Sequence, residues 1–175
     1  MNGARVTLRE LNAGSLPEFL SACGVLFEGS PWVAERAWLR RPFRSLEALH
    51  REMVAAVRAA SPEEKLGLIR AHPDLVGRLT ARNPTLVGHS AREQAAAGLD
   101  SLTDEEARTF RSYNEDYHEK FGFPFVICAR ENRKEAILQA FPRRLVQARE
   151  QEIETALAEI AKIAWLRLRD AVSEG

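Results

Sequence analysis

Apolar residues recur at steps of three and four over much of the chain, which is the period of an amphipathic helix. The clearest run follows Ser45 and consists of Leu46, Leu49, Met53, Val57 and Ala60. The alternation that marks a β-strand is almost absent. Residues 123–127 are the one candidate, and because this short segment contains Pro124 we expect an extended, buried connector, with an isolated strand as the alternative. The pattern predicts an all-α fold.

Local start and stop signals divide the chain into about eight helices. Four starts have the Ser/Thr-x-x-Glu pattern of a capping box, at Ser15, Ser61, Ser90 and Thr103. The other starts are expected at residues 30–31, at Ser45 and at residues 132–135. Stops are expected at Gly24, near residue 40, at residues 72–73, at Gly98 and at residues 141–142. One long C-terminal helix should then run to about Val172, because no glycine or proline interrupts it.

Composition places the chain among ordinary globular proteins. It has 175 residues, 45% hydrophobic and 29% charged, which argues against disorder and fits a single domain over residues 1–175. Lys plus Arg and Asp plus Glu are 25 each, and this balance argues against a nucleic-acid partner. No apolar run is long enough to cross a membrane and the N-terminus lacks a signal-peptide core, so we expect no membrane partner and a cytoplasmic location.

His72 is the first candidate for chemistry. It lies where a helix must stop and is followed at once by the rigid Pro73, a geometry that can aim an imidazole into a cleft. A histidine favoured by the dipole at a helix C-terminus is the alternative. Asp74 next to them has a structural alternative of its own, as a turn carboxylate that accepts from nearby amides.

The second candidate is the helix start at residues 90–94. Ser90, Glu93 and Gln94 would gather a hydroxyl, a carboxylate and an amide at a helix N-terminus, where free backbone N–H groups favour a polar, anionic ligand. The alternative is a capping box that only satisfies the helix.

The third candidate is Arg167 in the long C-terminal helix. It falls on an apolar stripe of that helix, which consists of Ile153, Leu157, Ile160, Ala164, Arg167 and Ala171. A guanidinium on a buried face needs an acceptor. An internal ion pair, a snorkelling side chain and a carboxylate clamp for a ligand all remain open. Arg169, on the other side, is expected to be solvated.

Signatures of other chemistries are missing. There is no HExxH motif, P-loop or dinucleotide fingerprint, and the spacing of His50, His72, His89 and His118 matches no standard zinc pattern, so we expect no metal. Cys23 and Cys128 lie among apolar neighbours without a CxxC pair, which predicts two free, buried thiols.

Four separated segments, in this order, resemble the OHCU decarboxylase family. They are Ala71-His72-Pro73-Asp74-Leu75, then Ser90-x-x-Glu93-Gln94-x-x-x-Gly98-Leu99, then Asn114-x-x-Tyr117-x-x-Lys120-Phe121-Gly122-Phe123-Pro124-Phe125-Val126-Ile127, and finally Ile163-Ala164-x-Leu166-Arg167-Leu168. The resemblance covers the chain from about Leu11 to Val172. It implies an all-α fold, no metal or organic cofactor, a small-molecule substrate and a homodimer. Val76 stands where many members carry a smaller alanine.

The resemblance also implies an activity and a set of site residues. Members of the family decarboxylate 2-oxo-4-hydroxy-4-carboxy-5-ureidoimidazoline to (S)-allantoin in uric acid breakdown. By position, His72 would be the catalytic proton carrier, with Glu93 to orient it or to bind the substrate. The substrate-binding residues would be Pro73, Ser90, Gln94, Arg167 and the segment with Phe125, Val126 and Ile127.

Three other functions remain open from the sequence. The chain could be a non-catalytic helical module that binds a ureide or purine-like ligand or docks a partner. It could be a metal hydrolase that uses His72, His89, His118 and Asp74. It could also be a related decarboxylase with a neighbouring substrate, because the motifs specify the chemistry better than the ring.

Overall fold

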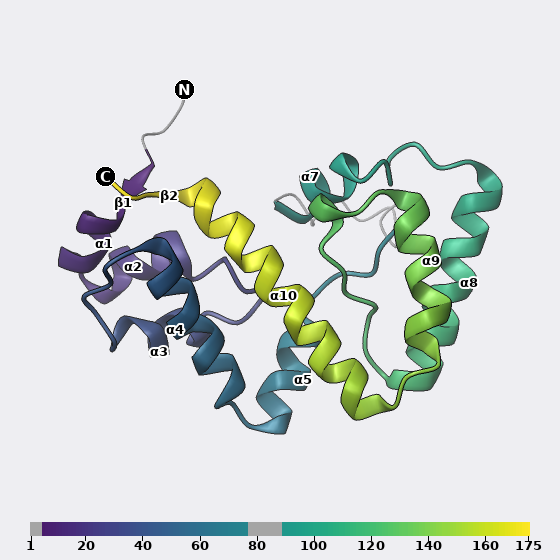
Figure 1. The fold of residues 1–175 in the computed structure, drawn as a ribbon, viewed down its shortest axis with the longest axis horizontal. Coiled ribbons are helices and arrows are strands. Elements are labelled where there is room, and N and C mark those ends of the chain that lie inside the picture. The colour runs from purple at the N-terminus through teal and green to yellow at the C-terminus, as the bar shows by residue number, and fades with distance from the viewer. Residues whose placement is uncertain (1–4, 77–88) are drawn as a thin grey trace. The chain divides into compact units, whose positions relative to one another are not determined.

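The computed structural model describes residues 5–76 and 89–175, and the side chains of residues 89–91 lie outside this description. The described chain is mostly helical (Figure 1). Its α-helices are α1 (Leu8–Ala13), α2 (Leu16–Cys23), α3 (Trp32–Trp38), α4 (Leu46–Arg58), α5 (Pro62–Arg70), α7 (His89–Ala96), α8 (Asp104–Phe121), α9 (Lys134–Leu145) and α10 (Arg149–Ala171). The predicted all-α fold with a long C-terminal helix is confirmed. Helix α1, which was not predicted, precedes the eight expected helices.

The chain forms two compact units. The first contains residues 1–71 and 161–175, and the second contains residues 72–160. Helix α10 contributes to both, because the boundary at residue 160 falls within it. That the whole chain is a single domain stays a prediction.

Capping interactions explain why the helices begin where they do. At the start of α5 the Glu64 carboxylate accepts from the Ser61 backbone N–H at 2.9 Å, and the Glu64 N–H donates to the Ser61 hydroxyl at 3.2 Å. Thr103 and Glu106 form the same reciprocal pair at the start of α8. Each pair satisfies two backbone donors that a helix start leaves free. The predicted boxes at Ser61 and Thr103 are confirmed, whereas the Ser90 side chain lies outside the described residues.

The core of the first unit forms between α2, α3, α4 and the end of α10. All five apolar positions predicted for the run after Ser45 are buried: Leu46, Leu49, Met53, Val57 and Ala60. The short strands β1 (Val6–Thr7) and β2 (Val172–Ser173) pair in parallel and join the two ends of the chain. Two-residue strands leave no alternating pattern in the sequence, so this pairing was not predicted.

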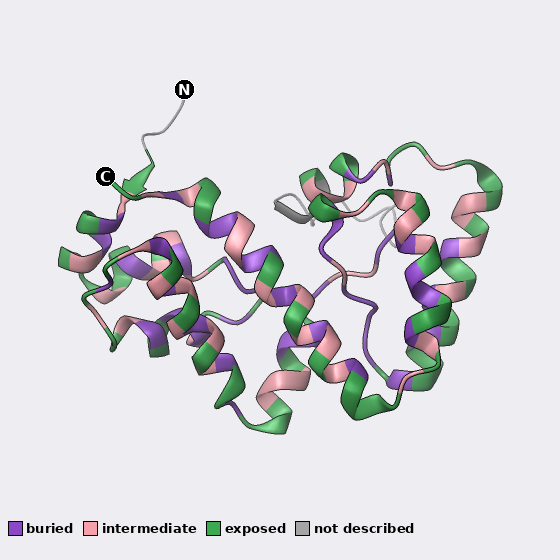
Figure 2. Cartoon of the chain, viewed as in Figure 1, coloured by how far each residue is buried: buried purple, intermediate pink, exposed green. Residues whose placement is uncertain are grey.

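The core of the second unit is aromatic. Helices α8 and α9 lie side by side (Figure 1), and six buried rings pack around them: Phe110, Tyr117, Phe121, Phe123, Phe125 and Phe141. In the sequence between α8 and α9, residues 124–128 form an extended connector that is buried along most of its length (Figure 2). It is not a strand, which confirms the preferred of the two sequence interpretations. A 3₁₀ turn, η1 (Ala129–Glu131), follows it.

The end of α9 differs from the prediction. Pro142 does not end this helix but lies inside it, and α9 continues to Leu145. The chain then leaves the helical path for residues 146–148 before α10 begins at Arg149, so the long helix does not start at residue 142. The interruption allows Arg144 of α9 to pair with the buried Glu152 of α10. A contact between two helices decides this break, and no glycine or proline marks it.

The buried face of α10 also differs in part from the predicted stripe. Ile160, Ala164 and Arg167 are buried, as expected, and Arg169 is exposed. At the start of the helix, however, the buried residues are Glu152 and Ala156, while Ile153, Leu157 and Ala171 are only half-buried. The sequence pattern missed this shift because a glutamate is rarely assigned to a core.

Candidate functional site

His72 lies directly after the C-terminal end of α5, where Ala71 caps the helix. Its side chain is only 7% exposed. The break in the helix was predicted from Pro73, because proline disfavours helical backbone in the residue before it. The predicted helix end is confirmed, and the imidazole is buried there, outside the regular backbone of the helix.

Helix α8 holds the segment that follows His72 at two points. The buried Asn114 side chain donates through Nδ2 to the Leu75 carbonyl at 2.7 Å. One turn further along, His118 Nε2 lies 2.6 Å from Asp74 Oδ1. Residues four apart on a helix share a face, so one side of α8 supports this segment. Asp74 is thus held by His118 and is not simply a local turn residue.

Helix α7 provides the third support. Gln94 accepts from the Val76 backbone N–H through Oε1 at 3.4 Å, and both Glu93 and Gln94 are half-buried. Val76 has a φ angle of 62°, which a β-branched side chain rarely adopts. Its left-handed backbone lies beside the segment with His72, where such strain often marks a functional site.

The connector of residues 124–128 is fixed by aromatic stacking and by one guanidinium. The Phe125 ring stacks on Phe141 with 3.8 Å between ring centroids. The Cζ atom of Arg144 lies 4.2 Å from the centroid of the Phe125 ring. The same side chain donates through Nη1 to the Val126 carbonyl at 2.6 Å. Phe125 and Val126 are buried and Ile127 is half-buried. The second unit contains His72 and six further predicted site residues with described side chains: Pro73, Glu93, Gln94, Phe125, Val126 and Ile127.

A buried polar cluster supports this connector, and the sequence reasoning missed it. It consists of Arg144, Glu152 and Tyr117, which are 6%, 0% and 0% exposed. Arg144 donates through Nε to Glu152 Oε1 at 2.7 Å, and the Tyr117 hydroxyl donates to the same carboxylate oxygen. Burial and this hydrogen bond raise the pKa of the Tyr117 phenol far above its usual value. No local pattern distinguishes these charged residues from ordinary surface charges.

Arg167 belongs to the first unit and is 2% exposed. It donates through Nη1 to Glu28 Oε2 at 3.0 Å, and the Leu26 carbonyl lies 3.5 Å from the same nitrogen. The internal ion pair that the sequence left open is therefore present. Glu28 was not predicted, because it lies 139 positions away in the chain. The ion pair holds the guanidinium in place but does not by itself decide whether Arg167 binds a ligand.

Both cysteines behave as the sequence predicted. Cys23 and Cys128 are free and buried. Burial raises the pKa of the Cys23 thiol to about 12 and, together with nearby carboxylates, that of Cys128 to about 11. At neutral pH both remain thiols, so neither is a nucleophile.

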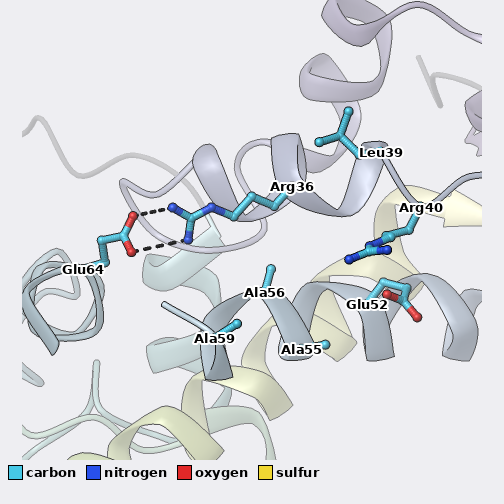
Figure 3. Close-up of a pocket in the computed structure, with 8 residues that line it drawn as sticks. All are labelled: Arg36, Leu39, Arg40, Glu52, Ala55, Ala56, Ala59 and Glu64. Carbon is cyan, nitrogen blue, oxygen red and sulfur yellow. Dashed lines mark hydrogen bonds and ion pairs between the residues drawn. The ribbon is translucent and has the colours of Figure 1, made fainter. Parts of the chain in front are cut away.

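Three further observations concern the described residues only. No group of three or more His, Cys, Asp or Glu side chains among them could hold a metal ion. No helix among them combines the length and apolar character needed to span a membrane. An open pocket in the first unit is lined by Ala55, Ala56 and Ala59 and by charged residues, among which Arg36 binds Glu64 with both terminal nitrogens (Figure 3). This pocket contains none of the predicted site residues.

Comparisons with known proteins point to one family. Residues 12–169 match the sequence profile described as OHCU decarboxylase. A Haloferax volcanii protein named 2-oxo-4-hydroxy-4-carboxy-5-ureidoimidazoline decarboxylase is 43% identical over 168 residues, which cover 96% of this chain and 97% of that protein. The Uric acid degradation bifunctional protein PucL of Bacillus subtilis is 40% identical over 96% of this chain, but the match covers only 33% of that longer protein.

Solved structures agree with this assignment. A crystal structure of (S)-allantoin synthase superimposes with a TM-score of 0.74 at 31% identity, covering 95% of this chain and 54% of that chain. The profile match and the relatives each span most of the sequence, including the segments with His72, Gln94, Phe125 and Arg167. The chain belongs to the OHCU decarboxylase family.

Proposed function

We propose that this protein decarboxylates 2-oxo-4-hydroxy-4-carboxy-5-ureidoimidazoline to (S)-allantoin in the breakdown of uric acid. The observation that carries the proposal is the family match over residues 12–169. Relatives that are named for this reaction also match this chain over nearly their whole length. The buried imidazole of His72 is suited to proton transfer, and the segment that follows it is held by α7 and α8.

The substrate carries its own electron sink. Carbon 4 of the ring bears the carboxylate and the hydroxyl, and carbon 5 bears the ureido group and a double bond to a ring nitrogen. As the bond to CO₂ breaks, its electron pair forms a bond between carbons 4 and 5, and the former C=N pair moves to nitrogen, which takes a proton. The hydroxyl then loses its proton to become a carbonyl, and carbon 5 gains one. The sum is one CO₂ released and one proton taken up.

His72 is the proposed proton carrier in this sequence. The unperturbed pKa of histidine lies near neutrality, so an imidazole can accept the hydroxyl proton and return a proton to the ring. Glu93 would orient the imidazole or accept from the hydroxyl and ureido groups. Delivery of the proton to one face of carbon 5 would give the (S) product.

The remaining residues are proposed to bind and orient the substrate. Ser90 and Gln94 would recognise ring and ureido amides, and Pro73 would shape the pocket beside His72. Arg167 would bind an anionic or carbonyl oxygen, since its guanidinium offers several donors in one plane. The backbone at Phe125, Val126 and Ile127 would hydrogen-bond the ring. No hydrogen bond among the described residues uses the N–H of Phe125 or Ile127, which leaves these two donors for a ligand.

The proposal extends to the state of the protein in the cell. We propose a homodimer located in the cytoplasm, acting on a small-molecule substrate without a metal or organic cofactor. The homodimer and the lack of a cofactor rest on the family resemblance, whereas the location rests on the sequence, which has no apolar run long enough to cross a membrane. The C=N bond of the substrate accepts the electrons that a cofactor would otherwise receive, so the decarboxylation can proceed without a cofactor.

The test is the stereochemistry of the product, because the substrate also decays spontaneously to racemic allantoin. Wild-type protein should yield an excess of (S)-allantoin, followed by circular dichroism. Replacing His72 by Ala should lower kcat by at least about 10²-fold, the usual contribution of a general acid–base group, and should abolish the excess. The matched control is His50→Gln, which replaces a half-buried histidine that has no proposed role in the reaction.

The outcomes separate the alternatives. A His72→Ala variant with near-normal turnover would refute the role of this imidazole. A racemic product formed at the uncatalysed rate by the wild-type protein would refute the proposed reaction. If allantoin still bound in that case, the chain would be a non-catalytic binding module.

A further inference from the structure

We propose that Arg144, held by Glu152, is a positioning residue for substrate binding. It would act through the backbone of the connector of residues 124–128 and would not touch the substrate itself. The inference rests on the proposed function, because that function assigns the backbone at Phe125, Val126 and Ile127 to the ring of the substrate.

Two nitrogens of the Arg144 guanidinium donate hydrogen bonds inside the second unit. Its Nε donates to Glu152 at 2.7 Å, its Nη1 donates to the Val126 carbonyl at 2.6 Å, and its Cζ atom lies 4.2 Å from the centroid of the Phe125 ring. Glu152 is fully buried and also accepts from Tyr117 of α8. The cluster thus links α8, α9 and α10 to a single backbone carbonyl in the connector.

Two contacts hold the same edge of this connector. The Val126 carbonyl accepts from Arg144, and two residues later the Cys128 N–H donates to Glu159 Oε2 at 2.8 Å. In an extended segment the backbone groups of successive residues point to opposite edges, so Val126 and Cys128 share one edge. Phe125 and Ile127 then present their backbone groups on the other edge.

The second edge carries the donors that a ligand would need. Among the described residues, no hydrogen bond uses the N–H of Phe125 or Ile127. These N–H groups suit acceptors such as the carbonyl oxygens of a cyclic ureide. Because one short segment carries both edges, the contact of Arg144 with Val126 determines where these N–H groups lie.

A charged pair is needed here for geometry more than for stability. Apolar side chains of similar volume are often as stable as a buried ion pair, or more so. Apolar side chains could not, however, bind the Val126 carbonyl. A planar guanidinium can hold a carboxylate and a carbonyl at once, which is what Arg144 does.

The experiment replaces the whole cluster, so that no buried charge or hydroxyl is left without a partner. The variant combines Tyr117→Phe, Arg144→Met and Glu152→Leu. Two quantities are measured on the full-length protein: the Kd and stoichiometry of (S)-allantoin by calorimetry, and hydrogen exchange of residues 124–128. We expect Kd to rise about tenfold at unchanged stoichiometry, and exchange in the connector to rise while α8 stays protected. Lys134→Met, which removes a different ion-pair partner from α9, is the control and should change neither quantity.

The readouts distinguish positioning from general damage. A loss of stoichiometry at unchanged Kd would mean that the cluster only keeps the protein folded, and this would overturn the proposal. So would an unchanged Kd together with unchanged exchange. If the triple variant does not fold, Arg144→Lys is measured in its place, because an ammonium keeps the charge opposite Glu152 but lacks the planar fork.

The same data separate this inference from the proposed function. Wild-type protein that neither binds allantoin nor forms an excess of the (S) product would refute the function, and with it the role of Arg144 in binding. Hydrogen exchange of residues 124–128 in the wild-type protein and the variant would still show whether Arg144 holds the connector. A wild-type protein that is active while the variant keeps its Kd would refute the role of Arg144 alone.

Discussion

At the scale of single residues, the sequence indicates which residues are candidates for function, and the folded structure shows which residues hold them. The sequence identified His72 and Arg167 as candidates, and both are buried. It did not identify Glu28, which binds Arg167, or Asn114 as the residue that holds Leu75. A buried polar group needs a partner, but the partner's position depends on the folded chain. Candidates can therefore be found in sequence before their supporting residues can.

Arg167→Lys tests whether this guanidinium does more than pair with Glu28. Lysine keeps the positive charge opposite Glu28 but loses the planar set of donors, so binding of a substrate oxygen should weaken. We expect KM to rise about tenfold, the effect of roughly 1.4 kcal/mol of lost binding. Steady-state kinetics with the product measured by circular dichroism gives the value. Arg169→Lys, an exposed change on the same helix, should leave KM unaltered, and equal KM values for both variants would exclude the proposed role.

At the scale of helices, local chemistry decides most of what is observed. Ser61 and Thr103 begin helices because their side chains and the glutamates three residues later satisfy the free N–H groups. Gly122 ends α8 with a φ angle of 76°, which glycine adopts without strain. Which face of a helix is buried depends on contacts between residues far apart in the sequence. His50 of α4, for example, binds the Ala161 carbonyl of α10 at 2.8 Å and packs on Trp165.

This contact makes the stability of the protein depend on pH. Burial lowers the pKa of His50 below the usual 6.5, although its hydrogen bond to Ala161 acts in the opposite direction. As pH falls below about 6.5, the unfolded chain takes up a proton at this residue before the folded one does, so the free energy of unfolding decreases. The decrease ends once pH falls below the lowered pKa of the folded state.

Thermal unfolding of the wild-type protein and of His50→Gln at pH 8 and pH 5.5 checks this expectation. The wild-type protein should lose more stability on acidification than the variant, by at most about 1.4 kcal/mol for each pH unit in the window. A glutamine amide can still donate to the Ala161 carbonyl but does not titrate. Parallel loss in the two proteins would show that another group is responsible.

At the scale of the whole molecule, the chain divides into two compact units joined by α10. The second unit contains His72, Glu93, Gln94 and the connector with Phe125, while Arg167 belongs to the first. The family assignment rests on this whole length and not on a single motif, since the profile match runs from residue 12 to 169.

The proposed homodimer is a property of the whole molecule and has a direct test. Light scattering on the eluted protein should give a mass of about twice the 19.7 kDa of one chain. The dimer should persist on dilution to the concentrations used for activity. A mass equal to one chain at those concentrations would refute it.

The sequence by itself determined the all-α fold, most helix boundaries and the family, because caps, prolines and the period of apolar residues act over a few neighbouring positions. Tertiary structure alone decided the break between α9 and α10, the pairing of β1 with β2, and the buried position of Glu152. Each of these depends on groups that meet only in the folded chain. Burial of a charge such as Glu152 costs free energy unless partners such as Arg144 and Tyr117 surround it, and only the packed helices bring them together.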